Sequence, residues 1–121
     1  GYRTTIGSDF FSNFNLTILD GGGVEIGNHV FIGPNVGIYT ANHPADVKRR
    51  EKGYEWALPV KIGDKVWIGG GVTILPGVTI GDNSDRCRKC CNKGYSSQCS
   101  CCRQSMQDHQ RSGRRRQIWD Y

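Results

Sequence analysis

The 121-residue sequence lacks any apolar run that approaches the roughly 18 residues needed for a membrane-spanning helix. It also lacks the pattern of a signal peptide, namely a charged start, an apolar stretch and a small-residue cleavage site. We therefore predict no membrane partner and a cytoplasmic location. The chain begins with Gly1 rather than Met, so we expect an N-terminal truncation. Its length suits one domain with a modest core.

Two further absences divide the chain at residue 84. Residues 1–84 contain no cysteine, so any cysteine-based metal site must lie in residues 85–121, which hold all six cysteines. Residues 85–121 contain no valine and only one isoleucine, so they cannot extend an apolar core. The formal charge is −1 for residues 1–84 and +6 for the rest of the chain. Because the positive charge belongs to this tail and not to a folded surface, we predict no nucleic-acid partner.

Residues 1–84 do contain a six-residue repeat in which a valine precedes each isoleucine by two positions. The isoleucines of its two regular runs are Ile26, Ile32 and Ile38, then Ile62, Ile68, Ile74 and Ile80. A period of six fits neither a helix nor simple strand alternation, and is typical of a solenoid in which three short strands close a coil of about 18 residues. We therefore predict an all-β fold, a parallel β-helix with isoleucines stacked inside it. Ile6 and Ile18, with Ser12 between them, predict a further coil.

The repeat stops after Ile38 and resumes at Val60. A solenoid that loses its period and then resumes it has usually extruded a loop, so we predict one at about residues 39–59. Long loops inside compact domains are usually functional or disordered. This loop contains His43 and Pro44, followed by a basic run over residues 48–52. The basic run has two interpretations, a solvated face or a contact with the phosphates of a cofactor.

Several motifs follow one another in a fixed order along the repeat. They are Asn13-Phe14-Asn15, Ile18-Leu19-Asp20, Gly33-Pro34-Asn35-Val36, Tyr39-Thr40 with His43-Pro44, Val66-Trp67-Ile68-Gly69-Gly70 and Pro76–Ser84. Through these motifs residues 1–84 resemble the maltose and galactoside O-acetyltransferases, a family of hexapeptide-repeat enzymes. The resemblance implies left-handed coils and a homotrimer with active sites between neighbouring β-helices. It also implies that acetyl passes from acetyl-CoA to a sugar hydroxyl.

The same resemblance implies roles for six residues and no metal. It assigns the general base to His43, acceptor binding to Asn13 and Asp20, and cofactor binding to Trp67, Gly70 and Gly71. The base is chemically sensible, because a neutral imidazole can take the proton of a hydroxyl as it attacks a thioester. Two assignments have alternatives. Asp20 could be a turn residue before the glycines that follow it. Trp67 could pack at a subunit interface.

The hexapeptide β-helix also serves as a non-catalytic scaffold and as a metal-dependent lyase that uses several histidines as zinc ligands. Only His29 and His43 lie within the repeat, which is too few for such a zinc site. His29 follows Asn28 at a turn of the repeat, and we expect it at the surface. A purely structural solenoid would not need the loop that carries His43 and Pro44.

The Cys- and Arg-rich tail, residues 85–121, has two interpretations. Cys87 and Cys90 have the spacing of a zinc knuckle, with further cysteines and His109 beyond them. Alternatively, the tail is read in a shifted frame. Suitable synonymous codons with one base dropped encode Ile-Gly-Ala-Gly-Ser-Val-Val-Thr-Lys and onward, which resembles the missing end of the family, including a cofactor-binding Thr-Lys pair. We predict a frameshift and an unstructured tail, and hence a weakly stable and poorly active chain.

Overall fold

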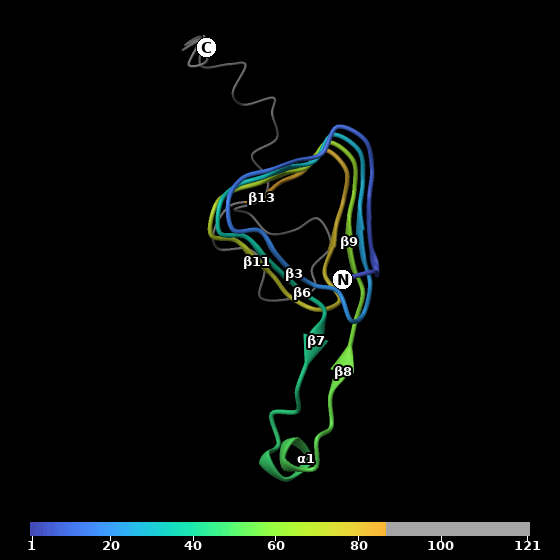
Figure 1. Ribbon diagram of the computed structural model, residues 1–121, viewed down its shortest axis with the longest axis vertical. Coiled ribbons are helices and arrows are strands. Elements are labelled where there is room, and N and C mark those ends of the chain that lie inside the picture. Colours follow the sequence, from blue (N-terminus) through green and yellow to red (C-terminus); the bar gives the residue numbers. More distant parts are fainter. Residues whose placement is uncertain (87–121) are drawn as a thin grey trace.

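The structure, a computed structural model, describes residues 1–86, in which all strands except two in a loop form three parallel sheets. Sheet A holds β1 (Thr4–Ile6), β4 (Val24–Ile26), β9 (Val60–Ile62) and β12 (Thr79–Ile80). Sheet B holds β2 (Phe11–Ser12), β5 (Phe31–Ile32), β10 (Trp67–Ile68) and β13 (Asp85–Arg86). Sheet C holds β3 (Thr17–Leu19), β6 (Gly37–Tyr39) and β11 (Thr73–Ile74). The three sheets make the three sides of a stack of coils with a triangular outline (Figure 1).

The coils pair in a register that aligns the repeat from one coil to the next. The partners form one column per sheet: Ile6, Ile26, Ile62 and Ile80 in sheet A, Ser12, Ile32 and Ile68 in sheet B, and Ile18, Ile38 and Ile74 in sheet C. Within residues 1–86 the core cluster consists of thirteen valines and isoleucines of the repeat, each at most 4% exposed. The predicted parallel β-helix of hexapeptide repeats is therefore confirmed.

A ladder of polar contacts runs along the corner that follows sheet A. The amide of Ser8 donates to Oδ1 of Asn28 (2.9 Å), the amide of Asn28 to Oδ1 of Asp64 (2.7 Å), and the amide of Asp64 to Oδ1 of Asp82 (2.8 Å). The next residue at each level has a left-handed backbone, with φ between 53° and 55°: Asp9, His29, Lys65 and Asn83. The side chain of His29 is 54% exposed, which confirms its predicted place at the surface.

The coils differ in length at one corner, which the expected coil of about 18 residues did not anticipate. Ile62 pairs with Ile80, eighteen residues later, but Ile18 pairs with Ile38, twenty residues later. The two additional residues lie in the corner between β3 and β4, where Asp20 is followed by three glycines. The corner between sheets C and A is therefore the place where this β-helix accepts insertions.

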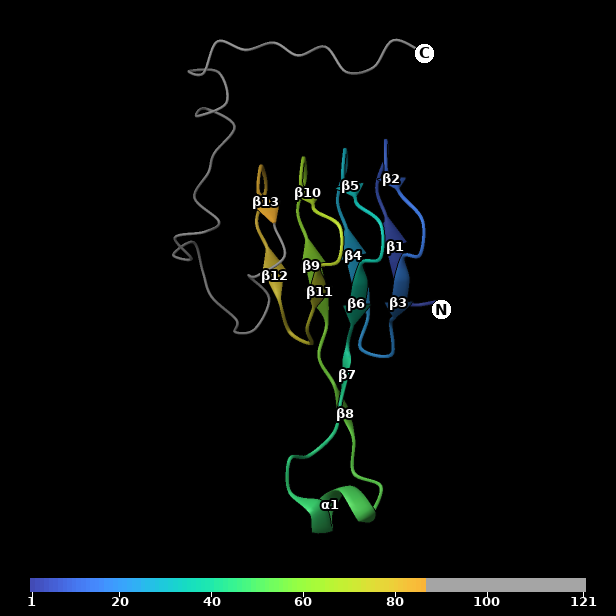
Figure 2. The ribbon, with the colours of Figure 1, turned by 90° about the vertical axis from the view of Figure 1, so that its left-hand side faces the viewer.

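The predicted loop at about residues 39–59 is confirmed, and it leaves the stack at this same corner (Figures 1 and 2). Its base is an antiparallel pair, β7 (Ala41–Asn42) and β8 (Trp56–Ala57). Its tip carries α1 (Val47–Glu51), in which no residue is buried. No helix within residues 1–86 is long and apolar enough to cross a bilayer.

The all-β expectation missed α1. A helix of five residues is too short to show an apolar period, so the repeat could not indicate it. The available signal was a helix cap, because Asp46 accepts a hydrogen bond from the amide of Arg49 at 2.9 Å. The tail predictions, namely the cysteine-based metal site with Cys87 and Cys90 and the unstructured segment, concern residues 87–121 and lie outside the described residues.

The stack predicts a strong dependence of stability on position along it. Ile68 is 0% exposed in the third coil, whereas Ile6 is 47% exposed in the first. Ile68→Ala should lower the free energy of unfolding by about 2–5 kcal/mol, because it removes a buried side chain and leaves a cavity. Ile6→Ala is the matched control and should cost much less. Urea unfolding followed by circular dichroism measures both, and equal losses would contradict the stacked core.

Candidate active site

His43 lies directly after β7, where the loop leaves the coils. Its amide donates to Oδ1 of Asn42 at 3.0 Å, and the buried Pro44 restricts its backbone from the other side. The guanidinium of Arg50, in α1, donates to the carbonyls of Pro44 (2.9 Å) and Ala45 (3.2 Å). The side chain of His43 is exposed, and within residues 1–86 its imidazole has no hydrogen-bond partner. The main chain around His43 is thus held while the ring stays open to a ligand or another chain.

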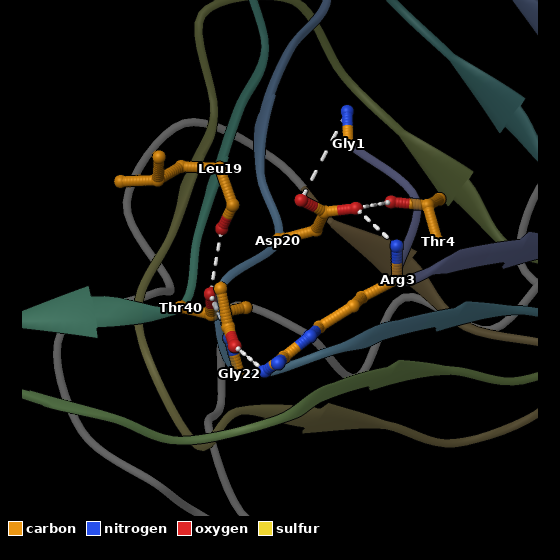
Figure 3. A network of polar contacts seen from close by, with 8 residues as sticks. Gly1, Arg3, Thr4, Leu19, Asp20, Gly22 and Thr40 are labelled. Atoms are coloured by element: carbon orange, nitrogen blue, oxygen red, sulfur yellow. Dashed lines mark hydrogen bonds and ion pairs between the residues drawn. The ribbon is translucent and has the colours of Figure 1, made fainter.

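Asp20 is bound into the corner of the first coil (Figure 3). Its Oδ2 accepts hydrogen bonds from the amide of Arg3 and from the hydroxyl of Thr4, both at 2.9 Å. The Arg3 guanidinium donates in turn to the carbonyl of Gly21 at 2.6 Å. The Thr4 hydroxyl, aided by the Arg3 amide, lowers the pKa of Asp20 below its usual value of 3.8 despite some desolvation. These are the contacts of a turn residue, and the acceptor contact of Asp20 stays a prediction.

The basic run of the loop divides into two parts. Arg50 is used within the loop, where it holds Pro44 as described above. The others line a pocket of about 620 Å³, formed by Pro44, Ala45, Asp46, Lys48, Arg49, Lys52, Tyr54, Glu55 and Trp56. The pocket begins at the residue after His43, but none of the six predicted site residues lines it. Its lining carries three cations, Lys48, Arg49 and Lys52, and two carboxylates, Asp46 and Glu55, so it fits both interpretations of the basic run.

An aromatic stripe crosses the outer face of sheet B. It consists of Phe11, Phe31 and Trp67, which pair with one another in successive coils. These side chains are 53%, 51% and 55% exposed, and the rings of Phe11 and Phe31 lie 6.0 Å apart. Of these three residues, only Trp67 was predicted from the sequence as part of the site. Phe11 and Phe31 could have been identified by their positions in the repeat, because each of the three rings comes directly before an inward residue.

The corner that follows sheet B carries Asn13 in the first coil and Gly70 and Gly71 in the third. The amide of Asn13 donates to the carbonyl of Ile32, and the amide of Gly71 to that of Pro34, both at 2.8 Å. Gly71 has a left-handed φ of 71°, and a Cβ on Gly70 would lie 3.2 Å from Pro34. Coil packing therefore explains both glycines, and their contact with a cofactor stays a prediction.

One chain does not bring the predicted site residues together. They fall into two groups, His43 and Asp20 at the corner between sheets C and A, and Asn13, Trp67, Gly70 and Gly71 along sheet B and its following corner. Sheet C separates the two groups. Among residues 1–86, no three His, Cys, Asp or Glu side chains are arranged to hold a metal ion.

Comparison with known proteins places this architecture. The family model described as bacterial transferase hexapeptide (six repeats) matches residues 59–85. The galactoside O-acetyltransferase of Escherichia coli is 49% identical over 84 residues, which are 69% of this chain and 41% of that protein. The solved maltose O-acetyltransferase of Clostridium difficile is 54% identical with a TM-score of 0.68, over 69% of this chain and 45% of that one. Over about 69% of its length the chain matches the hexapeptide-repeat acetyltransferases.

Another similar member of the family was solved with acetyl coenzyme A. It is a hexapeptide-repeat acetyltransferase of Vibrio cholerae, 46% identical with a TM-score of 0.68 over 70% of this chain and 46% of that one. The left-handed parallel β-helix expected from the family resemblance is confirmed by these likenesses. The chain spans less than half the length of each of these three proteins.

The lowered pKa of Asp20 predicts how the corner responds to pH. Asp20→Asn removes the anion that accepts from Arg3 and Thr4, so the variant should be less stable than the wild type at neutral pH. The higher stability of the wild type should be fully present above pH 3.8, the usual pKa of an aspartate. It should be lost as the pH falls through the lower pKa that Asp20 has in the folded protein. Thermal unfolding from about pH 7 down to about pH 2 should show the two proteins converging at the acid end. A difference in unfolding temperature that stays constant across this pH range would contradict the stabilising role of the Asp20 carboxylate.

Proposed function

We propose that this chain carries the β-helical core of an enzyme that transfers acetyl from acetyl-CoA to a hydroxyl of a sugar or similar acceptor. The observation that supports this most is the loop with His43 and Pro44, which leaves the second coil of a hexapeptide β-helix. Similar solved chains are named as a maltose O-acetyltransferase and as an acetyltransferase complexed with acetyl coenzyme A. Because this chain spans 45% and 46% of these two solved chains, the activity is proposed for the whole protein.

In the proposed mechanism His43 is the general base. Its neutral imidazole takes the proton of the acceptor hydroxyl as the hydroxyl oxygen attacks the thioester carbonyl. The resulting oxyanion needs hydrogen-bond donors nearby. When it collapses, the carbon–sulfur bond breaks, and the imidazolium returns the proton to the departing thiolate. The products are an O-acetyl ester and a free thiol, and His43 is restored.

The other predicted residues bind the two substrates in this proposal. Acceptor binding is proposed for Asn13 and Asp20, and donor binding for Trp67, Gly70 and Gly71. The two glycines leave the coil edge without Cβ atoms, so an extended pantetheine arm has room along the backbone there. The exposed ring of Trp67 offers this arm an apolar surface. In Asp20, Oδ2 accepts both hydrogen bonds of the corner, while Oδ1 lies 4.0 Å from the amino group of Gly1.

We also infer that the enzyme is a homotrimer. Two observations support this assembly: the site residues lie in two separate groups on one chain, and the aromatic stripe exposes three large rings. Exposed apolar patches commonly mark interaction surfaces. In a threefold ring each subunit presents one face to the different face of the next, so His43 of one chain can meet sheet B of its neighbour.

The first test is thiol release from acetyl-CoA with a panel of sugars. His43→Ala should lower the rate about 10²- to 10⁴-fold, because it removes the base, while His29→Ala, a surface control, should change little. The chain should be assayed as it stands and with the coil that the shifted frame would encode. A non-catalytic scaffold would show no activity in either form, and a rate unaffected by His43→Ala would exclude this residue as the base.

Mixing inactive chains tests whether the site lies between subunits. His43→Ala and Trp67→Ala chains, each impaired alone, should regain about a quarter of the wild-type rate when refolded together in equal amounts, since random assembly joins an intact histidine to an intact tryptophan at one interface in four. A site within a single chain would regain nothing.

We further propose that residues 85–121 arise from a shifted reading frame. The backbone of β13 supports this, because Arg86 pairs with Ile68 at a register position that holds Ile or Ser in the other coils of sheet B. The family match also ends at residue 85. The encoding DNA after the codon for Ser84 should restore the family pattern in another frame. Stoichiometric zinc bound by the purified chain would favour the cysteine-based metal site instead.

A further inference from the structure

The loop that carries His43 rests on the corner of the first coil. The first coil is two residues longer than the third, and the two additional residues lie in this corner, residues 20–23. The loop leaves the second coil directly beside this corner. Two insertions in successive coils thus lie in contact at one corner of the triangle. The contacts between them involve Thr40 and Gly22.

Thr40 is the one buried polar side chain within the described residues, with an exposure of 0%. Its hydroxyl donates to the carbonyl of Leu19 (2.6 Å) and accepts from the amide of Gly22 (2.8 Å). Its own amide also donates to the carbonyl of Leu19, at 3.0 Å, and its carbonyl accepts from the amide of Leu58, at 2.8 Å. Figure 3 shows the contacts of Thr40 with Leu19 and Gly22 of the first coil. Together with the bond from the Leu58 amide, they tie the first coil to both the outgoing and the returning strand of the loop.

Gly22 makes the second contact of this junction. A Cβ built on Gly22 would lie 2.9 Å from the carbonyl carbon and oxygen of Leu58 and 3.0 Å from its nitrogen. These atoms belong to the main chain, so they cannot move aside as a flexible side chain would. The neighbouring Gly21 is different, because a Cβ there would meet nothing closer than the Thr40 hydroxyl at 4.0 Å. The returning strand thus packs directly on the backbone of the first coil at Gly22.

We propose that Thr40 and Gly22 are positioning residues that set the direction in which the loop leaves the coils and thereby place the imidazole of His43. Thr40 lies three residues before His43, with only the short strand β7 between them. The part of this proposal that concerns catalysis rests on the proposed function, whereas the clamp itself does not. Asp20 completes the device, because its hydrogen bonds to Arg3 and Thr4 hold the corner on which the loop rests.

The clamp is tested by backbone hydrogen exchange on the full chain, comparing loop residues 41–57 with coil residues 60–80. Thr40→Val keeps the shape of the side chain but leaves the half-buried Gly22 amide without its acceptor, so exchange in the loop base should rise roughly tenfold or more. Thr40→Ser retains the hydroxyl and should stay within about twofold of the wild type. Exchange in the coils should change little in either variant.

Two glycine variants provide a matched pair that does not depend on Thr40. Gly22→Ala should raise loop exchange as Thr40→Val does, because the new methyl group displaces Leu58. Gly21→Ala should leave it unchanged. The proposal is overturned if Thr40→Val leaves the loop protected, if the two alanine variants behave alike, or if exchange rises equally in coils and loop.

The catalytic part is tested with the kinetics of acetyl transfer. Thr40→Val should lower kcat while the KM for acetyl-CoA stays within about twofold, and Thr40→Ser should restore kcat. Loss of loop protection without any fall in kcat would overturn the positioning of His43. If no acceptor is acetylated by the wild type, the proposed function fails, and the exchange data still decide whether the clamp exists.

Discussion

The stacking of valine and isoleucine side chains from one coil onto the next is the interaction on which the whole structure depends. The strands are only two or three residues long, too short to be stable alone. Each coil covers its apolar interior only with the coils above and below, so the fold exists as a stack or not at all. The polar ladder through Asn28, Asp64 and Asp82 and the left-handed corner residues maintain the spacing that this stacking requires.

The stack is also the part of the molecule that the sequence predicts best. A side chain such as Ile68 repeats a local pattern, and the period alone determines that it lies inside. The same period located the loop, because an insertion is visible as the place where the pattern stops and resumes. The surface position of His29 followed from its turn for the same reason. In each case the information was contained within a few neighbouring residues.

The features that the sequence analysis missed depend on contacts between distant residues. Thr40 is buried because its hydroxyl bonds Leu19 and Gly22, twenty-one and eighteen residues away, and nothing beside it in the chain reveals this. Phe31 points outward, and its exposure depends on whether another segment or chain covers the outer face of sheet B. The repeat contains no information about such a contact. Asp20 could be assigned by resemblance, but its bonds to Arg3 and Thr4 span a whole coil. His43 and Trp67 lie in separate groups on one chain, and no local pattern in the sequence relates their positions.

The order of strand pairing has a consequence for how the protein is made. Each coil pairs with the coil that precedes it in the sequence, at separations of eighteen, twenty or thirty-six residues. A ribosome therefore releases the coils in the order in which they dock, and every new turn covers the open apolar end left by its predecessor. The loop separates the second coil from the third in the sequence. While the loop is being synthesised, the stack therefore consists of two coils, and the apolar end of the second coil stays uncovered until the third coil emerges.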